Sequence, residues 1–126
     1  MNTAKKWNIL FIKDDRSMFD SDTKIFNDLF NKVDKVLGKE EALRFFNSNQ
    51  YDIVLADLSV EAEGVGLLKQ MKDNKTEQVI FALVSPEDTD KLYGIADLGI
   101  NAFELIPEQF DQALEQIAIF NPYEEQ

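Results

Sequence analysis

Three short runs of apolar residues without polar alternation stand out along the chain. They cover residues 9–12, 53–56 and 79–84. Continuous apolar runs of this length are typical of strands that are buried on both faces of a parallel sheet. Two weaker segments, residues 33–37 and 102–105, also fit short strands, the first of them at an edge of the sheet. The pattern therefore predicts five strands.

Between these runs, apolar residues recur at helical spacing. The first helical segment begins at about Ser17, and its apolar face comprises Met18, Ile25, Phe26, Leu29 and Val33. Further helices are predicted over residues 39–47, 64–72 and 88–98. A final helix is predicted from Pro107, because proline suits the first helical turn. The inner face of this last helix comprises Phe110, Leu114, Ile117 and Ala118.

Strands and helices thus alternate five times, with connections of a few residues. Such alternation is typical of a doubly wound α/β fold, in which helices cover both faces of a parallel sheet. The length of 126 residues suits one domain with one core, which we expect over residues 1–120. Residues 121–126 are a polar tail and fit either a plain terminus or the start of a linker.

The composition excludes several classes of function. The net charge of −11, from 13 basic and 24 acidic residues, disfavours direct binding to nucleic acid, which requires a basic surface. The chain has no histidine and no cysteine, which excludes Ser-His-Asp catalysis, a phosphohistidine on this chain and metal sites built from nitrogen or sulfur. Only oxygen ligands remain, so a bound metal would be a hard ion such as Mg²⁺.

The hydropathy pattern also bears on location. No apolar run approaches the ~18 residues that a membrane span needs. The N-terminus lacks the basic and then apolar pattern of a secretion signal. A cytoplasmic location is therefore expected, without contact to a membrane.

Polar residues follow each of the three apolar runs. Asp14 comes just after the first run, Asp57 ends the second, and Ser85 follows the third. The carboxyl ends of parallel strands meet at one edge of the sheet, where ligands of such folds bind. Two carboxylates at ~4 Å repel by about 4 kcal/mol at an effective dielectric of 20, so a cation, a lysine or a raised pKa is expected there. Helix capping is the alternative role for these residues, but their recurrence favours a site.

Several motifs around these strand ends belong to one known family. Asp57 follows Asp52-Ile53-Val54-Leu55-Ala56, and Ser85 follows the run over residues 79–84. Further motifs are Gly64 with Leu67-Leu68-Lys69, Leu98-Gly99-Ile100, Phe103 in the last strand, and Pro107. Together they make the chain resemble the receiver domain of two-component response regulators, from about Trp7 to Ile119.

The resemblance implies a flavodoxin-like fold with strand order 2-1-3-4-5 and five helices, acting as a signalling module and not as an enzyme. It implies that Asp57 accepts a phosphoryl group from a histidine kinase or a phosphotransfer protein. Ser85 would contact the phosphate, and Phe103 would be the aromatic switch. A homodimer through the face of the last helix is also implied.

The resemblance further implies a Mg²⁺ site beside the acceptor. Its ligands would be Asp14, Asp57 and the main-chain carbonyl of Ser59, with Asp15 as a further candidate. The alignment without gaps places Lys13 and Asp14 on the acidic pair that ends the family's first strand. Sliding by one residue would pair Asp14 with Asp15, but it would move Ile25 and Leu29 off the apolar face of the first helix. The first alignment is preferred.

Departures from the family pattern concern the same site. Lys13 replaces one acidic residue, and Ile106 stands where the family has its phosphate-binding lysine. The loop after Asp57 is about one residue shorter than usual and lacks its proline, and Pro86 follows Ser85 where a small residue is preferred. Phosphoryl transfer to a carboxylate needs the phosphate charge neutralised, so these departures predict weakened chemistry.

Lys13 supports two interpretations. Its ammonium could sit between Asp14 and Asp57 in place of the divalent ion, or it could replace the missing lysine on the phosphate. Three hypotheses about function follow: a receiver that still takes phosphate at Asp57, a pseudo-receiver that acts only through protein contacts, and an enzyme of another class. The third is disfavoured, because the sequence shows neither a Gly-rich phosphate loop nor a nucleophile–base pair.

Overall fold

The protein forms a five-stranded parallel sheet with helices on both faces. The computed structural model describes residues 7–13, 24–57, 63–84, 86, 99–104 and 106–120. The strands lie in the order β2-β1-β3-β4-β5, and every neighbouring pair is parallel. This order confirms the doubly wound α/β fold predicted from the sequence. The strands are β1 (Asn8–Lys13), β2 (Lys32–Leu37), β3 (Ile53–Asp57), β4 (Val79–Val84) and β5 (Asn101–Glu104).

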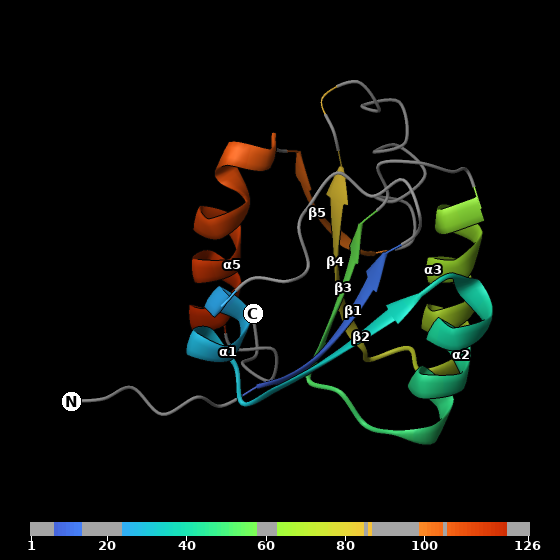
Figure 1. Cartoon of the computed structure of the whole chain (residues 1–126). Helices are drawn as coiled ribbons and strands as arrows, with labels where there is room; N and C mark the ends of the chain where they lie inside the picture. The colour runs from blue at the N-terminus through green and yellow to red at the C-terminus, as the bar shows by residue number, and fades with distance from the viewer. Residues whose placement is uncertain are drawn as a thin grey trace.

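The described helices form two layers around the sheet. Helices α1 and α5 cover one face, and α2 and α3 cover the other (Figure 1). A 3₁₀ turn over Pro107–Gln109 leads directly into α5. The fifth helix predicted over residues 88–98 lies outside the described residues, and none of the described helices has the length and apolarity needed to cross a membrane. The helices are α1 (Lys24–Leu29), α2 (Lys39–Ser48), α3 (Glu63–Asn74) and α5 (Phe110–Ile119).

Several predicted boundaries shift by one to three residues in the structure, and the first helix and the last strand are two examples. Val33 was expected to end the apolar face of the first helix as well as to begin the edge strand. It belongs to β2, where it pairs with Ile9 of β1, because backbone pairing to the central strand satisfies its N–H and C=O groups. The described part of the first helix ends at Leu29. The last strand begins at Asn101, one residue earlier than expected, and Leu105 lies outside the described residues.

The alternation of side chains along the strands divides the core into two halves. On the side of α2 and α3 lie Leu10, Val54 and Ala82, among others. The side of α1 and α5 contains a phenylalanine cluster, in which the ring of Phe11 lies 5.0 Å from that of Phe26 and 6.2 Å from that of Phe110. Strand β3 is buried along its whole length. It therefore holds Asp57, its last residue, in a fixed position.

A buried tyrosine ties β2 to the chain that enters β3. The hydroxyl of Tyr51 donates a hydrogen bond of 2.6 Å to Oδ2 of Asp34, whose carboxylate also lies 3.7 Å from the Lys32 ammonium. Burial raises the pKa of Tyr51 above its ordinary value of 10.0, and the hydrogen bond to Asp34 and the negative charge of that residue raise it further. The folded state therefore holds the phenol proton more tightly than the unfolded chain does.

We expect Tyr51→Phe to lower the free energy of unfolding at neutral pH by about 1–2 kcal/mol, since it removes a hydrogen bond to a charged group. The stabilisation from Tyr51 is complete below pH 10 and is lost progressively as the pH rises above that value. The variant should accordingly lose less stability than the wild type in this alkaline range. Urea unfolding of both proteins, followed by circular dichroism at neutral pH and again above pH 10, measures this difference. Equally steep alkaline losses in both proteins would contradict it.

Candidate functional site

The candidate site lies in one row of residues across the carboxyl end of the sheet. Asp57 of β3 pairs with Leu83 of β4, and Leu83 pairs with Phe103 of β5. On the other side of β3, Ile12 pairs with Ala56, so Lys13 continues the same register beside Asp57. Side chains of one row share a face of the sheet. Leu83 packs in the core half beneath α1 and α5, which places the row on that face.

Asp57 is the one buried polar or charged side chain in the described part of the chain, with 4% of its surface exposed. Burying an ionised carboxylate is costly unless a partner or ligand compensates it. The strand that ends in Asp57 lies in the middle of the sheet and is apolar up to this point. A buried carboxylate at such a position is typical of a functional group, more than of a turn.

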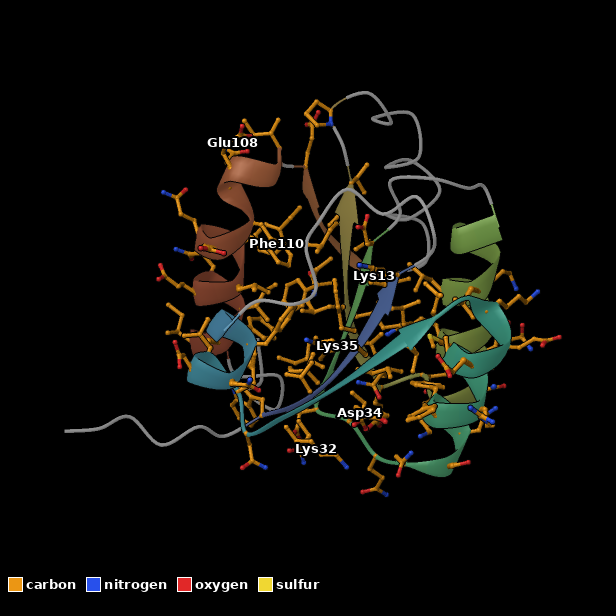
Figure 2. The ribbon with its side chains drawn as sticks, viewed as in Figure 1. Lys13, Lys32, Asp34, Lys35, Glu108 and Phe110 are labelled. Atoms are coloured by element: carbon orange, nitrogen blue, oxygen red, sulfur yellow. The ribbon has the colours of Figure 1, made fainter. Side chains whose placement is uncertain are left out.

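Lys13 brings a positive charge to the same strand ends. It is the last residue of β1, and Figure 2 shows it at the tip of that strand. The neighbours of β1 in the sheet are β2 on one side and β3 on the other. The strand order reverses between β1 and β3, and Lys13 and Asp57 end these two strands. Ligands of doubly wound sheets bind at this switch point. The main chain of Lys13 is fixed there, because its carbonyl accepts a hydrogen bond of 2.9 Å from the N–H of Gly38.

Phe103 and Asp57 are two strands apart in the row, about 10 Å between backbones at the usual strand spacing. The ring of Phe103 is half-buried and stacks on Phe81, with 5.5 Å between ring centres. Leu83, which is fully buried, lies between Phe103 and Asp57 in the register. Sequence reasoning did not single out Leu83, although the alternation along β4 already places it on the same face as Phe81.

Ile106 lies just beyond β5 and has 43% of its surface exposed. Its backbone caps the following 3₁₀ turn: its N–H donates to Oε1 of Gln109 at 3.0 Å, and its carbonyl accepts from the N–H of Gln109 at 2.9 Å. This reciprocal arrangement resembles a capping box. The turn is thus held by main-chain and glutamine contacts. The aliphatic side chain of Ile106 offers no group that could bind phosphate oxygens.

Four predicted site residues, Asp14, Asp15, Ser59 and Ser85, lie outside the described residues. Within the described ranges, no group of three or more acidic side chains is placed to hold a metal ion. Asp57 supplies a buried carboxylate of the hard oxygen type that Mg²⁺ prefers. Lys13, beside Asp57 in the register, brings a positive charge to the same strand ends. A magnesium site at these strand ends would therefore need further oxygen ligands, and the predicted ones follow β1 and β3 directly in the sequence.

The fold is that of CheY-like receiver domains of response regulators. A receiver domain protein from Methanospirillum hungatei JF-1 superposes with a TM-score of 0.68 at 16% identity, over 92% of this chain and 94% of that one. The response regulator TrrA from Thermotoga maritima, solved in complex with Mg²⁺–BeF, gives a TM-score of 0.67 at 19% identity, over 87% of this chain and 95% of that one. These likenesses confirm the flavodoxin-like fold with strand order 2-1-3-4-5.

Sequence comparison finds a transcriptional regulator as a relative. The transcriptional regulatory protein DltR of Streptococcus agalactiae serotype III (strain NEM316) is 26% identical over 113 residues, which are 88% of this chain and 50% of the relative. The chain thus spans about half the length of the curated relatives it matches. No protein-family model matches the chain. The structural comparison confirms the resemblance to response-regulator receiver domains found in the sequence.

Proposed function

We propose that this chain is a receiver domain of a two-component phosphorelay, that Asp57 is its phosphoacceptor, and that its Mg²⁺ and phosphate chemistry is weakened. The observation that supports this proposal most is the burial of Asp57 at the switch point of a receiver-type sheet. The strand beneath holds this carboxylate in place at the edge where ligands of doubly wound sheets bind.

In the proposed reaction, an oxygen of Asp57 attacks the phosphorus of a phosphohistidine on a histidine kinase or a phosphotransfer protein. The P–N bond to that histidine breaks as the P–O bond to Asp57 forms, and the imidazole leaves with the electron pair and takes up a proton. Mg²⁺, when held by Asp14, Asp57 and the main-chain carbonyl of Ser59, with Asp15 as a further candidate, would neutralise the phosphate charge. Ser85 would then move towards the phosphate, and Phe103 would be repositioned.

Two residues of this chain weaken the reaction in our proposal. Phosphoaspartate carries nearly two negative charges, by analogy with other phosphorylated side chains. Ile106 cannot compensate them, because its side chain is aliphatic. Lys13 lies beside Asp57 in the register and opposes a divalent ion there. To move a two-state switch from 1:99 to 99:1, the phosphate must favour the active state by ~5.5 kcal/mol. This is difficult in a chain that has Ile106 in place of the phosphate-binding lysine.

The proposal is tested by exposing the protein to acetyl phosphate or phosphoramidate with Mg²⁺ and measuring its intact mass. We expect a small labelled fraction that disappears in Asp57→Asn, under conditions that label a typical receiver fully. The double variant Lys13→Asp/Ile106→Lys restores the family pattern and should be labelled more. Full labelling of the wild type would contradict the weakened chemistry. If neither the wild type nor the double variant were labelled, Asp57 would not be the acceptor.

A second candidate function is a pseudo-receiver that binds partners without chemistry at Asp57. The positive charge of Lys13 at the strand end favours it, since an ammonium next to Asp57 can neutralise the carboxylate permanently. The same mass measurement separates the two functions. A wild type that stays unlabelled, combined with a double variant that gains the label, would favour the pseudo-receiver.

A further inference from the structure

Three phenylalanine rings make a chain of contacts from the last strand to the end of the last helix. The ring of Phe103 in β5 stacks on the ring of Phe81 in β4, with 5.5 Å between ring centres and 29° between ring planes. The ring of Phe120, the residue that follows α5, also lies against Phe81, at 5.3 Å and 90°. Phe81 is therefore the middle ring of the three.

The middle ring is fixed by the core around it. Phe81 has 5% of its surface exposed, and its partner in the register on β3 is the fully buried Leu55. Stacked and edge-to-face pairs of rings stabilise a core beyond the area that they bury, and Phe81 makes one pair of each kind. Because a close-packed core transmits small displacements, a change in one of these pairs is felt by the other.

The two outer rings are held less firmly. Phe103 and Phe120 are only partly buried, and both pack against the core half beneath α1 and α5. Phe103 borders a groove of about 410 Å³, which leaves space next to its ring. The N–H of Phe120 donates a hydrogen bond of 3.1 Å to the carbonyl of Ile117 and so closes the last turn of α5. This hydrogen bond therefore reports on the state of the helix end.

We propose that Phe81 is a positioning residue that couples the ring of Phe103 to the end of α5. When Phe103 leaves its stacked position, Phe81 loses one partner and shifts, and Phe120 loses the ring face against which it rests. The last turn of α5 then opens more readily. The functional meaning of this coupling rests on the proposed role of Phe103 as the aromatic switch, but the coupling itself needs no phosphate at Asp57.

The test is hydrogen exchange of the Phe120 amide, measured by NMR on the whole chain without a phosphoryl donor. We expect Phe103→Leu, which removes the stacked ring, to speed this exchange about fivefold, within the range that one aromatic pair contributes. Phe103→Tyr keeps a ring at a half-buried position and should retain the wild-type rate. In a Phe81→Leu background the middle ring is missing, so adding Phe103→Leu should change the rate by less than about twofold.

The matched control is Phe30→Leu. Phe30 lies in the same core half and is almost fully buried, but its ring packs on Phe26 of α1, with 6.4 Å between ring centres. This variant also removes a ring from the core and destabilises it, yet the exchange of the Phe120 amide should stay within about twofold of the wild type. The control separates coupling through Phe81 from a general loss of stability.

A reverse measurement keeps the proposal testable if Phe81→Leu does not fold. Phe120→Leu changes a partly buried position and should shift the ring resonances of Phe103, whereas Phe30→Leu should not. Unchanged exchange in Phe103→Leu, or equal acceleration in Phe103→Leu and Phe30→Leu, would overturn the coupling. A full additive effect of Phe103→Leu in the Phe81→Leu background would do the same. Phosphoryl labelling of Asp57 is measured separately, so the coupling and the proposed function can fail independently.

Discussion

Replacing Lys13 with aspartate is expected to raise the affinity of the protein for Mg²⁺ by roughly a hundredfold, about 2.7 kcal/mol. Two unit charges at ~4 Å interact by about 4 kcal/mol at an effective dielectric of 20. The substitution turns a repulsive charge next to the proposed metal position into an attractive one. Solvent screening reduces the effect, because Lys13 is only half-buried, but the direction is fixed by the sign of the charges.

Isothermal titration calorimetry with Mg²⁺ measures this gain. The matched control is Lys69→Asp, which makes the same charge change on the exposed surface of α3, on the other side of the sheet. Lys69 pairs with Asp73 at 3.1 Å, so the control also removes an ion pair at the surface. It should leave Mg²⁺ affinity nearly unchanged. If the wild type already bound Mg²⁺ as tightly as Lys13→Asp, Lys13 would not act as a built-in cation.

The expected effect depends on the pairing of two strands, β1 and β3. Lys13 is placed beside Asp57 because Ile12 pairs with Ala56 in the register of β1 and β3. A shift of one residue in that register would turn the lysine side chain to the opposite face. The buried side chains on both faces of β1 and β3 prevent this shift, so the ammonium is held on the same side of the sheet as the carboxylate.

The sequence was sufficient to predict the sheet, because its central strands are buried on both faces. The runs over residues 9–12, 53–56 and 79–84 contain no polar residue, and such short runs are typical of a sheet covered by helices on both sides. The start of the edge strand β2 was harder to predict. Val33 fits the helical period and the strand period equally well, and its pairing with Ile9 depends on contacts between segments that sequence periodicity does not describe.

The candidate site was predictable only in part. Asp57 could be found because it ends an apolar run, and Lys13 because it follows one. The row that joins Asp57 to Leu83 and Phe103 required the register of three strands, which a single sequence does not specify.

The largest effect on stability is expected from Phe11→Ala. Phe11 is fully buried in the inner strand β1, and its ring contacts those of Phe26 and Phe110 at 5.0 and 6.2 Å between centres. It therefore joins α1 and α5 to the sheet. Truncating a buried phenylalanine to alanine costs about 3–5 kcal/mol, through lost transfer free energy and the cavity left behind. Domains of this size are stable by only about 5–15 kcal/mol.

Phe11→Ala should accordingly lower the urea midpoint strongly or prevent folding, as followed by circular dichroism. Phe11→Leu keeps most of the apolar volume and should cost roughly 1–2 kcal/mol, which makes it the measure of partial loss if the alanine variant does not fold. Because Phe11 lies on the same face as Asp57, two residues before the row of the site, loosening it should also disturb the backbone that holds Lys13. A leucine variant as stable as the wild type, together with an alanine variant that loses less than about 1 kcal/mol, would contradict the central role of the phenylalanine cluster.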